Sequence, residues 1–506
     1  MAAHWYRELL KYDKEKIISD LGGGDAGKKR LEKLQLASIV KLVPAKASDS
    51  DEVLPEDLEQ VVDGNEKMVS FVYVGVVMLD DYVIYCYPKY ISSNNAPGFI
   101  EKFATVMASV KRYRKHKEQN VAIAKAGSDR NVSKLSVIME LLQHYYRNGL
   151  YIKSVKQQEI NGDGEINWGR TINETDAILL RKKPFYPDMF TEVAEWNEGD
   201  YFHRLHRFVI SDCFRTLKQD RLMDVLGVHG FLSSDIKDRH VFGKDKVIVQ
   251  KLQRELKTQF VTWKKEVLNL IISYIKLTGS SKKSRGLVFY GTKAMNMVWE
   301  DACKQVFNDM LGYKIKSDKM AFLAPKEQRC AYCKQLMEHR TELLEEKAAK
   351  KLRSQLENPI LQDVIDHPVW MKNDKGHISD SLIPDTIVIT GEGDDWEFCV
   401  YDAKYYNIKL DDDMVSGKPD IESVAKQYLY MMAYKDFMEY FNIKKKRNVF
   451  LFPSEDGNKR LGTVQLPFLN AFNEASIEVI KLDADKMLSM YVVGNKHIGL
   501  DEVINV

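Results

Sequence analysis

Two aspartates and a lysine in the last third of the chain have the types and spacing that metal-assisted hydrolysis requires. Asp385 follows a proline, and Asp402 and Lys404 are separated by one small residue, Ala403. Carboxylate oxygens are preferred ligands of Mg²⁺, which neutralises the charge of a phosphate and lowers the pKa of an attacking water. A neighbouring ammonium group orients that water and offsets the negative charge that develops. The three residues therefore fit the hydrolysis of a phosphodiester.

The surrounding sequence predicts a β-hairpin that would bring these residues together. Two strand-like runs, residues 382–390 and 396–406, flank the turn signal Gly-Glu-Gly-Asp-Asp. If the two aspartates face each other, the midpoint of the pairing falls between Gly393 and Asp394, inside that turn. Because side chains alternate along a strand, the second aspartate and the lysine share one face. The hairpin would thus gather two carboxylates and one ammonium group.

A surface hairpin with no catalytic role is the alternative interpretation, because Asp and Lys two residues apart are common on solvated strands. Here, however, Asp402 and Lys404 lie in the apolar run Phe-Cys-Val-Tyr-Asp-Ala-Lys-Tyr-Tyr. Charges in such a strand are costly unless they have partners or a task, and active sites are where such costs recur. We therefore favour the catalytic interpretation.

Two amphipathic helices and a further strand are predicted around the hairpin. Residues 293–312 predict a helix, and Glu300 lies at the edge of its apolar stripe. Residues 422–441 predict a second helix, and Gln427 borders its apolar stripe. Residues 447–453 predict a third strand. The expected order of this region is helix, strand pair, helix, strand.

The length of the chain, 506 residues, predicts more than one domain. We expect an α/β protein with an N-terminal mixed α/β domain in residues 1–190, which contains a hairpin within residues 71–91. Helical periodicity predicts a connector in residues 191–284, and residues 285–506 would form the domain that carries the aspartates and the lysine.

Composition leaves the binding partner open. The chain has 75 basic and 73 acidic residues, whereas a protein that coats nucleic acid would be strongly basic. The sequence contains no apolar run of about 18 residues and no secretory signal pattern, so we expect no membrane span. Six cysteines in so long a chain do not resemble a disulfide framework. We expect a cytoplasmic protein.

Two other patterns carry weaker predictions. Cys330 and Cys333 have the spacing of half a zinc site, but the sequence has no second such pair, and a helix turn is the favoured interpretation. The basic run of residues 111–117 fits either phosphate binding or a solvated helix face, and we favour the solvated face.

The combined motifs resemble the PD-(D/E)XK nuclease superfamily. Pro-Asp, then Asp-Ala-Lys, then a helix with a glutamine follow the superfamily pattern. The run Val-Gly to Pro-Lys within residues 74–91 is similar to a strand pair of McrC-type restriction subunits, and residues 164–172 and the Met-Val-Trp-Glu-Asp helix are similar to that group too. Over residues 70–455 the chain most resembles the LlaJI-like branch of McrC-related restriction proteins.

The resemblance implies a role for each matching residue. In the family pattern, Asp385 stands at the Pro-Asp position, and Asp402 and Lys404 stand at the Asp-X-Lys positions. Glu300 matches the acidic position on the first core helix, and Gln427 matches the polar position on the following helix. The resemblance implies that Mg²⁺ is held by Asp385, Asp402 and Glu300.

The resemblance also implies partners. The chain would cut DNA within a complex with an McrB-like AAA+ GTPase hexamer, on which the N-terminal domain would dock and which it would stimulate. The sequence has no G-x-x-x-x-G-K-[ST] pattern, so GTP would be bound by the partner and not by this chain. Two alternatives remain: a self-sufficient type II restriction endonuclease, and a non-cleaving adaptor of a AAA+ motor.

Overall fold

The computed structural model describes most of the chain. The described residues are 2–44, 67–79, 82–95, 97–122, 134–181, 183–196, 199–219, 222–279, 287–342, 344, 346–365, 368–372, 375–378, 381–393, 395–410, 414–467, 476–496 and 499–505. The chain divides into two compact units that alternate along the sequence. The first unit comprises residues 1–2, 77–83 and 128–290, and the second comprises residues 3–76, 84–127 and 291–506.

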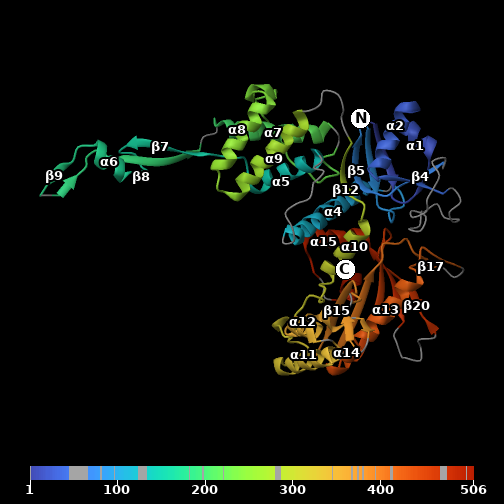
Figure 1. Cartoon of the computed structure of the whole chain (residues 1–506). Helices are drawn as coiled ribbons and strands as arrows, with labels where there is room; N and C mark the ends of the chain where they lie inside the picture. Colours follow the sequence, from blue (N-terminus) through green and yellow to red (C-terminus); the bar gives the residue numbers. More distant parts are fainter. Residues whose placement is uncertain are drawn as a thin grey trace. The chain divides into compact units, whose positions relative to one another are not determined.

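A five-stranded sheet forms the centre of the second unit (Figure 1, orange and red). Its strands, in spatial order, are β15 (Thr386–Glu392), β16 (Asp395–Ala403), β19 (Lys445–Ser454), β21 (Ile477–Asp483) and β20 (Lys459–Val464). The central strands β16, β19 and β21 run parallel, whereas β15 and β20 are antiparallel edge strands. The last eight residues of β19 are all buried, because both faces of a central parallel strand are covered.

The predicted hairpin is confirmed, together with its register. β15 pairs antiparallel with β16 along its length, beginning with Thr386 opposite Tyr401. Asp385 immediately precedes β15, so the same register places it opposite Asp402 at the end of the hairpin that is remote from the turn. The sequence arithmetic therefore identified the correct pairing.

Helices cover both faces of this sheet. Tyr401 of β16 packs against the C-terminal end of α10 (Met295–Val306), and Phe398 of the same strand packs against Tyr434, which ends α13 (Ile421–Ala433). Residues three apart on a strand point to opposite faces, so α10 and α13 lie on opposite sides of β16. The predicted helices around the hairpin are thereby confirmed as elements.

Segments far apart in the sequence meet on the α10 side. Figure 1 shows α4 (Phe99–Ala122, blue to cyan) beside α15 (Ala484–Val493, red), and both helices contact α10. The Arg112 guanidinium of α4 donates to the Val492 carbonyl at 2.9 Å and lies 4.9 Å from the centre of the Tyr491 ring. Helices from distant parts of the sequence, α4 and α15, are therefore packed together against α10.

The remaining elements of the second unit are short or peripheral. In chain order they are β2 (Lys11–Asp13), α1 (Lys14–Asp20), α2 (Gly24–Leu36), β3 (Val40–Val43), β4 (Met68–Phe71), α11 (Lys326–Thr341), α12 (Glu346–Leu356), β13 (Val369–Lys372), β14 (Lys375–Ile378), β17 (Lys409–Leu410), β18 (Val415–Ser416), α14 (Lys435–Tyr440) and α16 (Leu500–Asn505). A separate four-stranded sheet has the order β1 (Ala2–Arg7), β6 (Tyr82–Tyr87), β5 (Val74–Leu79) and β12 (Val288–Thr292). The hairpin predicted in residues 71–91 corresponds to β5 and β6, and its turn lies outside the described residues.

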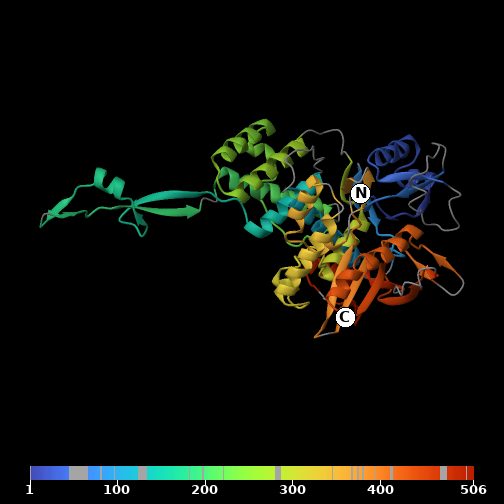
Figure 2. The same ribbon diagram turned by 60° about the horizontal axis from the view of Figure 1, so that its bottom comes forward.

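The first unit contains a helical group and a long arm. Its helices are α5 (Lys134–Asn148), α7 (Tyr201–Gln219), α8 (Asp245–Thr258) and α9 (Thr262–Gly279), and α9 packs against both α5 and α8. The arm leads away from these helices in both views (Figures 1 and 2). It comprises β7 (Ser154–Ile160), β8 (Glu165–Ile166), α6 (Trp168–Glu174), β9 (Ile178–Leu180), β10 (Lys183–Phe185) and β11 (Phe190–Trp196).

None of the described helices is long and apolar enough to span a membrane. The observed α/β architecture agrees with the predicted fold class at that level. The two compact units divide the chain differently from the predicted domain boundaries at residues 190 and 284, which stay predictions.

Candidate active site

The hairpin places the two aspartates and the lysine at one end of the central sheet. The Lys404 Nζ lies 2.8 Å from the Asp402 Oδ2 atom. The Asp385 Oδ2 atom accepts a hydrogen bond of 3.1 Å from the Ala403 backbone N–H, which joins the first aspartate to the strand that carries the other two residues. The side chains of Asp402 and Lys404 are 8% and 21% exposed, so this ion pair is largely shielded from solvent.

Burial and the neighbouring Asp402 disfavour ionisation of Asp385. Burial, followed by the charge and hydrogen bonding of Asp402, raises the pKa of Asp385 to about 7, while Lys304 and Lys404 act in the opposite direction. Burial lowers the pKa of Lys404, but the charge and hydrogen bond of Asp402, together with Asp385, outweigh burial and raise it overall. The site therefore combines a stable ammonium group with a carboxylate pair that carries excess negative charge when both members are ionised.

Helix α10 adds a second ion pair beside this group. Glu300 Oε1 lies 2.5 Å from the Nζ atom of Lys304, one helical turn further along. Burial lowers the pKa of Lys304, but Glu300 and then Asp385 outweigh burial and raise it. The structure thus brings Lys304 into the electrostatic reach of Asp385, and Glu300 is held through that lysine.

One backbone carbonyl of β19 joins the end of the hairpin to α10. The Leu451 oxygen of β19 accepts from the Lys404 backbone N–H at 2.9 Å and from the Trp299 indole N–H at 3.2 Å. Trp299 is fully buried, and it directly precedes Glu300 on the helix. The helix that carries Glu300 is therefore anchored to the same atom that positions Lys404.

Gln427 lies in the interface between α13 and the sheet. Its side chain is 0% exposed, and its Nε2 atom donates to the Val449 carbonyl at 3.3 Å. The backbone carbonyl of Gln427 accepts a hydrogen bond of 3.1 Å from the side-chain amide of Asn448. The Oε1 atom is buried and has no hydrogen-bond partner among the described residues. Gln427 therefore joins α13 to β19, and its catalytic role stays a prediction.

Lys304 and Tyr430 are two further residues that the structure places at this site. Lys304 follows Glu300 by four residues, and this helical spacing for an ion pair was available from the sequence. The Tyr430 hydroxyl donates to the Ile383 carbonyl at 3.1 Å, just before the hairpin. Burial, then Asp402 and Asp385, raise the pKa of Tyr430 to about 12, so its hydroxyl stays protonated near the carboxylates.

The donor set fits Mg²⁺ better than it fits a structural metal. Among the described residues, no group of three or more His, Cys, Asp or Glu side chains is arranged to hold a metal ion. Mg²⁺ keeps several waters and is commonly held by one or two carboxylates together with substrate phosphates. Asp385 and Asp402 meet that requirement, and the participation of Glu300 stays a prediction. Cys330 and Cys333 both lie on α11 as free thiols, which is the favoured interpretation of that pair.

Known proteins resemble the chain along most of its length. The model of the LlaJI restriction endonuclease family matches residues 73–327 and 344–488. The type II restriction enzyme BsuMI component YdjA of Bacillus subtilis (strain 168) is 24% identical over 514 aligned positions, which cover 99% of this chain and 92% of that protein.

Two solved assemblies from Thermococcus gammatolerans are also similar, at low levels. A chain of a half-complex of McrB AAA+ hexamers with bound McrC matches with a TM-score of 0.36 and 13% identity, covering 97% of this chain and 99% of that one. A chain of the McrBC complex matches with a TM-score of 0.25 and 14% identity, covering 59% and 85%. Because the family model spans most of its length, the chain belongs to the LlaJI restriction endonuclease family.

Proposed function

We propose that this chain is the Mg²⁺-dependent DNA endonuclease subunit of a restriction complex, with a PD-(D/E)XK core that hydrolyses phosphodiester bonds. The observation that carries the proposal is the opposition of Asp385 and Asp402 across the β15–β16 hairpin, with Lys404 in an ion pair beside them. Membership of a restriction endonuclease family makes DNA the expected substrate. The described cysteines are free thiols, which fits a cytoplasmic location.

Each of these side chains has a distinct task in that reaction. Bound Mg²⁺ would neutralise phosphate charge and supply a water of lowered pKa. Asp385 and Asp402 provide its ligands, and the Ala403 N–H holds the Asp385 carboxylate in place. The Lys404 ammonium stays charged beside Asp402, so it orients the attacking water and offsets the charge that develops on the phosphate.

Helix α10 supports the same site from the side. Lys304 lowers the electrostatic cost of ionising Asp385 and binds Glu300 through an ion pair of 2.5 Å. Glu300 would act as a further ligand, directly or through water, once Lys304 releases it to a cation. We infer this role for Glu300 because it contacts Lys304, and the charge of Lys304 also interacts with Asp385.

We further propose that an McrB-like AAA+ GTPase hexamer is the partner and that it binds the GTP. The arm of the first unit supports this proposal, because it exposes several apolar side chains to solvent. Leu179 on β9 is 74% exposed, and Leu180, Ile178 and Phe185 near it are all more than half exposed. Exposed apolar clusters of this kind mark protein interaction sites.

Plasmid cleavage by the full chain in Mg²⁺ tests the proposed activity. The chain is assayed alone and with the McrB-like GTPase of the same source plus GTP. Asp402→Ala should abolish cleavage, and Lys404→Ala should lower it by about 100-fold. Asp395→Ala and Lys445→Ala are the matched controls, because those residues form an exposed ion pair at the turn end of the same hairpin. Cleavage by the chain alone would support a self-sufficient endonuclease. No cleavage under any condition would support a non-cleaving adaptor.

A further inference from the structure

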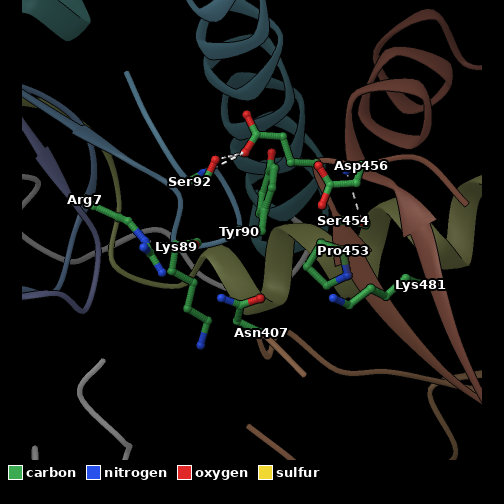
Figure 3. A pocket seen from close by; sticks show the side chains of 10 residues that line it. Arg7, Lys89, Tyr90, Ser92, Asn407, Pro453, Ser454, Asp456 and Lys481 are labelled. Carbon is green, nitrogen blue, oxygen red and sulfur yellow. Dashed lines mark hydrogen bonds between the residues drawn. The ribbon is translucent and has the colours of Figure 1, made fainter. Parts of the chain in front are cut away.

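A cavity of about 110 Å³ in the second unit is lined by three basic side chains that the proposed reaction does not use. Figure 3 shows Arg7 and Lys481 on opposite sides of it, with Lys89 and Asn407 between them. Lys89 belongs to the Pro-Lys-Tyr run that follows β6. This motif has no role in the proposed cleavage reaction. The cavity is therefore lined by basic residues from three distant parts of the chain: Arg7 of β1, Lys89 of the motif and Lys481 of β21.

The wall of this cavity is continuous with the catalytic strand. Asn407 lies three residues after Lys404, and Ser454 is the last residue of β19. The Lys89 Nζ lies 4.9 Å from the centre of the Tyr405 ring and 5.4 Å from that of the Tyr406 ring. The lysine of the motif thus lies over the two residues that directly follow the catalytic lysine.

A buried carboxylate holds this wall in position. Glu8 Oε2 accepts from the Tyr405 hydroxyl at 2.7 Å and from the Lys89 backbone N–H at 3.4 Å. The Arg7 Nε–H donates to the Lys89 carbonyl at 3.0 Å. Glu8 and Lys89 are both buried. Arg7 and Lys89 are therefore fixed relative to Tyr405, and hence to Lys404, which directly precedes it.

The lining also contains acidic groups, of which one is already engaged. Glu455 accepts from the backbone N–H and the hydroxyl of Ser92 at 2.7 and 2.6 Å, and Lys102 lies 3.6 Å from its other oxygen. Asp456 lines the cavity as well. The lining itself holds three cations and two carboxylates, and the buried Glu8 adjoins Lys89 from behind it. The Tyr90 hydroxyl, buried in the same wall, has no hydrogen-bond partner among the described residues.

We propose that this cavity binds a backbone phosphate of the DNA that passes the catalytic residues, with Arg7, Lys89 and Lys481 as its cationic donors. The inference rests on the proposed nuclease function and adds a DNA contact to it. Arginine and lysine side chains make most phosphate contacts in protein–DNA complexes, where they fix the register of the duplex. The cavity is smaller than the roughly 300 Å³ at which small-molecule pockets begin, so it suits a phosphate group better than a nucleotide.

The salt dependence of DNA binding tests this proposal. Binding of the full chain to a fluorescent duplex of fixed sequence is measured in EDTA, without cleavage, over a range of salt concentrations. Each phosphate contact contributes about 0.9 to the slope of log affinity against log salt. Lys481→Gln and Lys89→Gln should each weaken binding, and each should reduce that slope by up to the 0.9 or so of this one contact. Lys481→Arg should retain the wild-type slope, because it retains the charge.

Lys445→Gln is the matched control, since Lys445 begins β19 and Ser454 of the cavity ends it. Wild-type slopes in both glutamine variants, with wild-type melting temperatures, would overturn the phosphate site. If the wild type cleaves DNA but the glutamine variants keep the wild-type salt slope, only the phosphate site is refuted. If the variants have a reduced salt slope but the wild type never cleaves DNA, only the nuclease function is refuted. Inorganic phosphate that competes with DNA in the wild type but not in Lys481→Gln would support the site. If it bound the cavity without affecting DNA binding, the assignment to DNA would be wrong.

Discussion

The Lys404 ammonium lies 2.8 Å from the Asp402 carboxylate, although only the small residue Ala403 separates them in the chain. Alternation along β16 places both side chains on one face, and the 8% exposure of Asp402 makes the pair depend on itself for charge compensation. A bound cation would compete with Lys404 for the same carboxylate. Removal of the Lys404 charge should therefore change the affinity of Asp402 for a metal cation, and this change can be measured.

Lys404→Ala should lower DNA cleavage by about 100-fold, because one charged group that stabilises the transition state is lost. The metal-free variant should also melt at a lower temperature than the wild type, since Asp402 loses its partner. Mg²⁺ should then raise the melting temperature of the variant more than that of the wild type. Thermal melting with and without Mg²⁺ checks this, and an equal or smaller shift in the variant would contradict the linkage.

Asp385→Asn should stabilise the metal-free chain at pH 8, and the stabilisation should be smaller at pH 5. The folded-state pKa of Asp385, about 7, is raised above its ordinary value, so the protonated form favours folding. The stabilisation from that proton is present at low pH and is lost as the pH rises through about 7. Each pKa unit corresponds to about 1.4 kcal/mol. Melting curves in EDTA at the two pH values test this, and a pH-independent difference would refute it.

Gln427→Ala should act mainly on stability. The side chain fills a fully buried position and donates to the Val449 carbonyl, so its removal should cost about 2 kcal/mol of the free energy of unfolding. Gln427→Met, which retains the volume, should cost less. Urea unfolding measures both effects. A loss of cleavage as large as that of Lys404→Ala, without loss of stability, would instead place Gln427 in the catalytic group.

Leu179→Ser should leave the fold intact and weaken stimulation of the partner. Leu179 is 74% exposed on the arm, so the chain gives up little buried surface when it is replaced. GTP hydrolysis by the McrB-like GTPase is measured with the wild-type and the variant chain, with Val241→Ser, at 65% exposure outside the arm, as the control. Equal stimulation by both variants and the wild type would argue against docking through the arm.

The hairpin could be predicted because its information is local. Two strand-like runs and the glycine-containing turn between them determine the register, and Gly391 shows how tight the constraint is. It has a φ of +137°, and a Cβ there would lie 2.1 Å from the Asp395 backbone oxygen. The helix that carries Glu300 could be predicted from its apolar stripe for the same reason.

Contacts between remote segments could not be predicted in this way. The approach of Lys304 to Asp385 and the gathering of Arg7, Lys89 and Lys481 depend on tertiary packing. No periodicity in the sequence reports which residues meet across such distances. Each compact unit is also built from segments that alternate along the sequence, so single boundaries at two positions could not describe them.

The hydrogen bond between Tyr405 and Glu8 spans 397 positions of the sequence. Closing so long a loop is entropically costly, and contacts of high sequence separation form late in folding. During synthesis, the first strand leaves the ribosome long before the residues that follow Lys404 exist. The buried Glu8 carboxylate therefore acquires its phenol partner only after Tyr405 has been synthesised, and the wall beside β16 is completed only then.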